Sequence, residues 1–458
     1  MWRPALVAAV LVAVASAAAG GHASTRLTLR PAWSDEVTLS SKHAARVPTS
    51  VRRTSTWCGT TSPTDRTPVA TGYPIHVYYA YPAGGGGTDQ SATVAPQIED
   101  MIDQIDAWWQ REDPSREPRF DMYAAPCGPQ VDLQVLPLSV ITTSTGDPHL
   151  VYDQVWSQLQ TQPDAATSKY LVFVDQVNTG NVCGVGGPAD DATLGGTAMG
   201  VATVLLASCS GADLASVAAH ELLHAVTPAS GFVGSPHTCP GDLFHVCDSN
   251  GDVLYPYTEI GSHITSIQLD VGHDDYWAGT APVNLQVQPW FIHTQDQAQL
   301  ALTVGGQGTV TSDIPGLDCT ASCSTSWDRG DALNLAAAPG AGERFVRWSG
   351  GCTGSASCSL TLDAAKQVGA LFAPATFGLT VQVRGSGAVT SRPGGLACRS
   401  GACSKPFTSY VPVVLTEKPA KGWRFTGWSG ACHGTRATCS VAMTAPAAAR
   451  ATFAKKRA

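Results

Sequence analysis

The sequence predicts an α/β domain with a mixed sheet, followed by two small all-β modules. Strand-like and helix-like segments alternate through the first part of the chain. The last third instead repeats itself with a period of about 80 residues and has no long helical pattern. Of the 458 residues, 43% are hydrophobic, which is enough for two or three domains with buried cores.

The N-terminus is typical of a secretory signal peptide. Arg3 precedes an apolar run over residues 5–14, and small residues suited to a cleavage site follow it. The run is shorter than the ~20 apolar residues that span a membrane. We therefore expect removal of residues 1–23, a lead-in or short propeptide over residues 24–50, and a secreted, extracellular protein with no membrane span.

Residues 51–286 are predicted to form the α/β domain. Apolar residues of its first helix recur at helical spacing from Ile98 to Trp109, and the last strand leads directly into the last helix. The predicted strands are at residues 75–81, 131–138, 169–176 and 197–208, and the predicted helices are at residues 95–112, 149–160 and 212–226. A linker over residues 287–299 is expected to separate this domain from the modules.

The all-β modules are predicted at residues 300–374 and 375–455. RFVRWSGGC at residues 344–352 recurs as RFTGWSGAC at residues 424–432, and each copy has glycine turns and two close cysteine pairs. The copies resemble the divergent B-repeat of internalin-type surface proteins, although Arg347 replaces the leading glycine in the first copy. The resemblance implies a spacer or an adhesive module that contacts a cell surface or matrix. We expect Trp348 and Trp428 to lie in the module cores.

Fourteen cysteines predict disulfides in an exported protein. No C-x2-C pair is present that would indicate a cysteine zinc site. The net charge of −8 and the charged fraction of 14% argue against a nucleic-acid partner. The close pairs expected to form disulfides are Cys239–Cys247, Cys319–Cys323, Cys352–Cys358, Cys398–Cys403 and Cys432–Cys439.

The segment HELLH at residues 220–224 carries the strongest chemical signal in the sequence. His220 and His224 lie one turn apart on a helix, so both imidazoles can reach one metal ion, and Glu221 lies beside them. Three protein ligands leave the fourth position of a catalytic zinc to water, whose proton a nearby carboxylate can take. Asp213 is expected to cap this helix, and Pro228 to prevent its continuation.

The order of parts around this helix resembles the metzincins, a family of zinc proteases. A metzincin helix ends at a glycine, its third histidine follows six residues after the second, and a methionine turn comes later. Thr227, Ser230 and Leu254 stand at those places here. The resemblance implies a zincin-like fold, a Zn²⁺ cofactor bound by the two helix histidines, and catalysis by Glu221.

The third zinc ligand is predicted to be His237. It is the first histidine after the helix and follows a loop whose glycines allow the chain to turn back. His245 is the second choice, because a Cys239–Cys247 disulfide would hold its loop near the site. Asp242 and Glu259 remain as oxygen-ligand alternatives, although zinc often takes nitrogen.

Other polar residues near the motif have weaker interpretations. Residues 248–252 alternate oxygen side chains like part of a calcium loop, but a tight Asp/Asn/Gly turn fits them better. His273 is expected to be structural or to contact substrate. Tyr255 and Tyr257 are alternative hydrogen-bond donors to an oxyanion.

The sequence thus predicts a secreted zinc-dependent metalloendopeptidase that acts on a protein or peptide substrate through water activated by Glu221. The alternative is a non-catalytic surface or matrix-binding protein, in which the α/β domain is a degenerate protease scaffold and the repeats are adhesive.

Overall fold

The computed structural model describes residues 57–66, 71–187, 198–209, 211–259, 263–277 and 281–457, together with the backbone of residues 35–40. The expected signal peptide lies outside these residues, as does most of the expected lead-in. Within the described residues the protein is mostly β-strand with three α-helices. None of the helices in this part of the chain is long and apolar enough to cross a membrane.

A seven-stranded mixed sheet forms the centre of the N-terminal domain. Its strand order is β10-β1-β8-β9-β7-β2-β6. The four strands at the β6 end run parallel, whereas β8 runs antiparallel to β9. The strands are β1 (Asp35–Ser40), β2 (Ile75–Tyr81), β6 (Leu133–Pro137), β7 (Lys169–Val174), β8 (Val182–Gly187), β9 (Gly200–Leu205) and β10 (Tyr257–Glu259).

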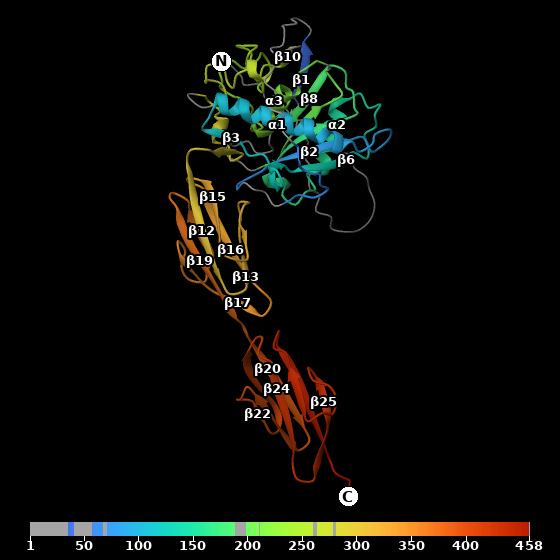
Figure 1. Ribbon diagram of the computed structural model, residues 1–458, viewed down its shortest axis with the longest axis vertical. Helices are drawn as coiled ribbons and strands as arrows, with labels where there is room; N and C mark the ends of the chain where they lie inside the picture. Colours follow the sequence, from blue (N-terminus) through green and yellow to red (C-terminus); the bar gives the residue numbers. More distant parts are fainter. Residues whose placement is uncertain are drawn as a thin grey trace, which may run out of the picture.

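Helices cover both faces of this sheet. Successive residues of β2 alternate between the faces, so Val77 packs in the same core cluster as α1 (Ser91–Glu112) and α3 (Leu214–Val226). Tyr78 packs in a second core cluster on the other face, with α2 (Pro148–Leu159). Figure 1 shows α1 and α3 beside the sheet, with the strands of the C-terminal region, residues 297–455, extending away from this domain.

Two segments expected to connect parts of the chain instead contribute structure to the N-terminal domain. In the lead-in, β1 pairs with β8 on one side and β10 on the other. In the expected linker, β11 (Phe291–His293) pairs with β3 (Arg116–Pro118). Trp290 and Phe291 are 0% exposed and belong to the core cluster of α1 and α3. The domain therefore extends beyond residue 286. A further short hairpin joins β4 (Met122–Ala125) to β5 (Gly128–Val131).

Each C-terminal repeat consists of two four-stranded sheets, and the strand order is the same in both repeats. The two small all-β modules are thereby confirmed, and they follow the N-terminal domain end to end (Figure 1). The first repeat contains β12 (Gln297–Gly305), β13 (Gly308–Ser312), β14 (Asp318–Cys319), β15 (Cys323–Asp328), β16 (Ala332–Pro339), β17 (Glu343–Gly350), β18 (Cys358–Thr361) and β19 (Lys366–Pro374). The second contains β20 (Thr376–Arg384), β21 (Gly387–Arg392), β22 (Ala397–Cys398), β23 (Gly401–Thr408), β24 (Val413–Pro419), β25 (Trp423–Gly430), β26 (Thr438–Val441) and β27 (Ala447–Lys455).

The repeat cores are apolar, and local disulfides fasten them. Trp348 and Trp428 are 3% and 6% exposed, which confirms the expectation that they lie in the cores. All five disulfides expected from sequence are present. The N-terminal domain adds Cys58–Cys127 and Cys183–Cys209.

The first repeat is joined to the N-terminal domain by polar contacts as well as by the chain. Arg119 donates to Asp328 at 2.7 Å, and both side chains are buried. The other carboxylate oxygen of Asp328 accepts from the backbone of His293 at 2.9 Å.

Candidate metal centre

Helix α3 presents His220 and His224 on one face, as the motif predicts. Asp213 caps its N-terminus by accepting from the amide of Ala215. The helix ends at Val226, where the hydroxyl of Thr227 donates to the carbonyl of Leu223 at 2.7 Å. Residues 215–226 are all buried, because α3 packs against the sheet and α1. The two histidines therefore face a protein interior, where neighbours can fix their orientation.

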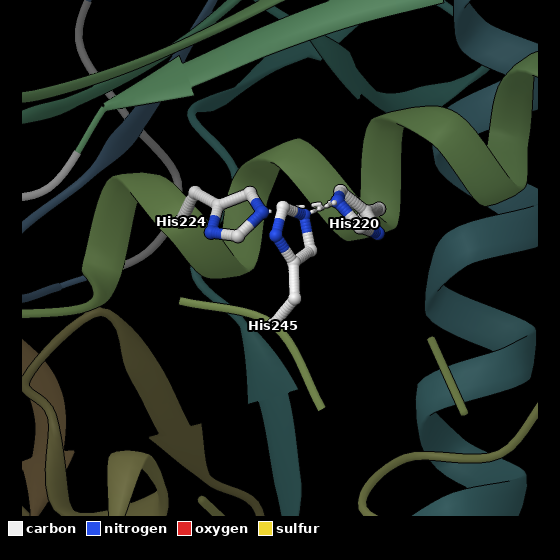
Figure 2. Close-up of side chains that lie close together, drawn as sticks. All are labelled: His220, His224 and His245. Carbon is white, nitrogen blue, oxygen red and sulfur yellow. Dashed lines mark hydrogen bonds between the residues drawn. The ribbon is translucent and has the colours of Figure 1, made fainter. Parts of the chain in front are cut away.

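The structure brings His245, and not His237, to these two histidines. The Nε2 atoms of His220 and His224 are 2.9 Å apart, and Nε2 of His245 is 3.2 Å from Nε2 of His220. All three side chains are buried, with exposed fractions of 1–2%. Figure 2 shows His245 approaching α3 from a separate segment, with its ring pointing at the other two.

Hydrogen bonds at Nδ1 orient two of the three rings. Nδ1 of His220 donates to the carbonyl of Val253 at 2.6 Å, and Nδ1 of His245 donates to Oδ2 of Asp242 at 2.6 Å. Both rings therefore direct the Nε2 lone pair into the cluster, the tautomer that a metal ligand requires. Nδ1 of His224 is buried and has no partner among the described residues.

Burial keeps the helix imidazoles neutral. It lowers the pKa of His220 to about 3, with a further contribution from His245. Burial and the two neighbouring histidines also lower the pKa of His224 well below its ordinary value. A neutral imidazole is the form that binds a metal. The three rings thus offer three uncharged nitrogen donors at one point.

Glu221 lies between α3 and strand β8 and is 0% exposed. A Cβ atom added at Gly184 would lie 2.5 Å from Oε1 of Glu221, and one at Gly186 would lie 2.7 Å from Oε2. The alternating glycines of the V-C-G-V-G-G strand therefore make room for this carboxylate. The sequence analysis did not predict a role for these glycines, although a G-x-G pattern within a strand is a visible signal of close approach.

His237 belongs to another set of contacts, which corrects the preferred assignment of the third histidine. Its Nδ1 donates to Oδ2 of Asp275 at 3.1 Å, and its backbone amide donates to Oδ1 of the same residue. The loop closed by Cys239–Cys247 then turns the chain, so that the return arm carries His245 under α3. Asp242 is not part of the three-histidine cluster but holds His245. The side chain of Glu259 lies outside the described residues.

The weaker candidates near the motif have other contacts or are exposed. Asp252 is 3% exposed and accepts from the amides of Leu254 and Val271 and from the hydroxyl of Tyr276. This supports the tight turn rather than a calcium loop. His273 is exposed, and the ring centroids of Tyr255 and Tyr257 are 5.9 Å apart.

Comparisons with known proteins identify the repeats. Residues 298–376 and 378–457 match the family model of the divergent InlB B-repeat domain. The match does not extend to the histidine cluster. A comparison with curated proteins finds no match to the chain.

Three solved structures have low sequence identity and low structural similarity to this chain. The Bacillus anthracis TIE protein has 8% identity and a TM-score of 0.23 over 35% of this chain, and the chain spans 34% of that protein. The minor pilin GBS52 of Streptococcus agalactiae has 8% identity and a TM-score of 0.15, over 35% of this chain and 97% of that one. OgpA from Akkermansia muciniphila has 9% identity and a TM-score of 0.23, over 84% of this chain and 97% of that one.

Proposed function

We propose that the N-terminal domain is a zinc-dependent hydrolase of peptide bonds, related to the metzincins, and that the repeats hold it against a cell surface or matrix. The observation that carries the first part is the convergence of three buried Nε2 atoms, from His220, His224 and His245. The second part rests on the B-repeat family match. Seven disulfides suit the oxidising, extracellular location that both parts require.

The donor set fits zinc. Three neutral imidazoles leave a fourth tetrahedral position, which is the arrangement of catalytic rather than structural zinc sites. Buried imidazoles whose nitrogens face each other within 3.2 Å, without a bridging carboxylate, are better satisfied by a shared cation than by one another. His245 would complete the set of ligands in place of the histidine that metzincins carry closer to the helix.

The protein side chains would divide the chemistry among themselves. When bound, zinc supplies Lewis acidity and lowers the pKa of water. Glu221 follows His220 directly and would accept a proton from the attacking water and return it to the leaving amine. Val253 and Asp242 hold the rings of His220 and His245. Gly184 and Gly186 fix the place of the Glu221 carboxylate against β8.

The alternative function is a surface or matrix-binding protein in which the N-terminal domain has no catalytic activity. The family match favours it, because that match concerns the repeats alone. The retained Glu221 and the three converging histidines favour the hydrolase.

The decisive experiment uses the full chain and its Glu221→Gln variant. We expect zinc to co-purify with both, and hydrolysis of a quenched-fluorescent peptide library to fall by on the order of 1,000-fold or more in the variant, since the ligands remain while the proton carrier is gone. A wild-type protein that binds zinc but cleaves no peptide would favour the alternative. Equal hydrolysis by both proteins would remove Glu221 from the mechanism.

A further inference from the structure

A second group of metal-ligating side chains lies apart from the α3 histidines. Asp65, His76 and Asp121 each bring one ligand atom to a common point, and these atoms all lie within 4.8 Å of one another. His76 is the second residue of β2, and Asp121 follows β3. Both are buried, at 3% and 2% exposed, whereas Asp65 lies on an exposed loop.

Hydrogen bonding gives His76 the orientation of a metal ligand. Its Nε2 lies 2.6 Å from Oδ2 of Asp164, and that oxygen also accepts from the hydroxyl of Ser168 at 2.8 Å. The other ring nitrogen, Nδ1, lies 2.8 Å from Oδ2 of Asp121. A carboxylate that accepts from one imidazole nitrogen while the other faces a carboxylate cluster is the usual outer-shell arrangement around metal-bound histidine.

Asp121 has an unused ligand atom. Its Oδ1 is buried and accepts no hydrogen bond within the described part of the chain. A buried carboxylate oxygen without a donor is costly unless a cation satisfies it. Asp65 brings a second carboxylate to the same place.

The local charge is negative. Asp65, Asp121 and Asp164 surround the single imidazole of His76, while Arg66 pairs with the neighbouring Asp132 at 2.6 Å. Three carboxylates against one imidazole leave an excess that a divalent cation would neutralise.

We propose that Asp65, Asp121 and Nδ1 of His76 form a second site for a divalent transition-metal ion of the zinc type, with Asp164 as a positioning residue. One nitrogen and two carboxylate oxygens suit Zn²⁺ better than Ca²⁺, which takes oxygen ligands alone. The exposed side of Asp65 leaves room for water as a further ligand. The ion would fasten the loop of residues 57–66 to β2, and none of its ligands belongs to the proposed catalytic centre.

The test is the zinc content of the full chain after loading with Zn²⁺ and dialysis. We expect two zinc ions per chain in the wild type and one in Asp121→Asn. His245→Ala should lose the other ion and keep this one, so the two sites are scored separately from each other and from peptide hydrolysis. Asp318→Asn, an exposed change in the first repeat, is the matched control and should keep two.

Milder variants cover the case in which Asp121→Asn fails to fold. Asp65→Ala should lower the affinity for the second zinc ion by more than about 100-fold. Asp164→Asn should lower it by about 10–100-fold, the range typical of a group that binds a metal ligand rather than the metal. One zinc per wild-type chain that His245→Ala removes, or unchanged zinc content in a folded Asp121→Asn variant, would overturn the proposal. In that case a protonated His76, which donates Nδ1–H to Asp121 and Nε2–H to Asp164, would hold the cluster together without a metal ion.

Discussion

The N-terminal domain and the C-terminal repeats bury different kinds of side chain. The domain encloses histidines and carboxylates, including His76, His220, Glu221 and Asp252, whereas the repeats enclose mainly aliphatic and aromatic residues with their cystines. Buried titratable groups cost stability unless neighbours or ligands satisfy them. This difference is the reason why we assign the proposed hydrolysis to the N-terminal domain and the proposed surface contact to the repeats.

The largest effect expected within this comparison is the loss of zinc on changing His245. His245→Ala should abolish zinc retention at the α3 site and reduce hydrolysis by on the order of 1,000-fold, because a catalytic zinc needs three protein ligands. His237→Ala should change zinc affinity by less than about tenfold, since Nδ1 of His237 binds Asp275 and the residue is not part of the three-histidine cluster. Titration with a chromogenic zinc chelator measures both, and the reverse order of effects would restore His237 as the ligand.

A methyl group on β8 should reduce catalysis without removing zinc. Gly184→Ala places a Cβ 2.5 Å from Oε1 of Glu221, and its three nearest contacts are all atoms of that side chain. We expect hydrolysis to fall by roughly 100-fold, because small displacements of a catalytic group have effects of that size. Gly378→Ala in the second repeat is the control, since its nearest contact would be an ordinary 3.9 Å to Ser404. Full activity in Gly184→Ala would show that catalysis does not depend on the position of Glu221.

Two disulfides close loops of similar length, and removing each one in turn distinguishes an effect on zinc binding from an effect on stability. Replacing Cys239 and Cys247 by serine, or Cys432 and Cys439 by serine, opens loops with separations of 8 and 7 residues. Chain entropy predicts a similar loss of about 2.5 kcal/mol in each case. Only loss of the Cys239–Cys247 disulfide should also lower the affinity for zinc, by about 10–100-fold, because this disulfide holds the loop that carries Asp242 and His245. Equal zinc affinity in the two variants would contradict a positioning role for that loop.

Acid should destabilise the metal-free N-terminal domain through its histidines. The pKa of His220 is lowered from 6.5 to about 3, so between these values the unfolded chain binds a proton that the folded chain does not. Stability therefore falls as pH decreases through this window, by up to about 1.4 kcal/mol per pH unit for each such histidine. Urea unfolding at pH 7 and pH 5, in the presence of chelator, measures the slope.

The control for this prediction is His224→Leu. Burial raises the pKa of Glu99 and of Asp252 to about 7. These two carboxyl groups therefore increase the free energy of unfolding as the pH falls, which is opposite to the effect of the histidines. The free energy of unfolding changes with pH by a different amount in wild type and variant, and this difference gives the contribution of His224. An identical slope in both would mean that His224 ionises freely in the folded domain.

The smallest effect is expected from removing the second repeat. A chain ending at Pro374 keeps the Arg119–Asp328 contact between the domain and the first repeat. Zinc content and peptide hydrolysis should stay within about twofold of the full chain, because distant sites act independently. A large loss of zinc or of hydrolysis would mean that the second repeat supports the site, which would contradict separate roles for the two regions.

The sequence predicted best where local interactions decide the structure. Helix α3 was expected at residues 212–226 and spans Leu214–Val226, with Asp213 as its cap. Its periodicity and its cap are encoded within a few turns of chain. The first helix begins at Ser91, earlier than the predicted start at residue 95, and Pro96 lies inside it.

The sequence alone determined the repeats, their cystines and the pair of histidines on α3, because repetition, short cysteine spacing and helical period require no knowledge of distant residues. Tertiary structure decided the rest. Asp275 binds His237 from 38 residues away, and Val253 and Asp242 orient His220 and His245. Trp290 completes a core formed by residues far earlier in the chain. The choice of the third histidine depends on which side chain the fold has already engaged elsewhere, and such contacts between distant segments leave no spacing signal in the sequence.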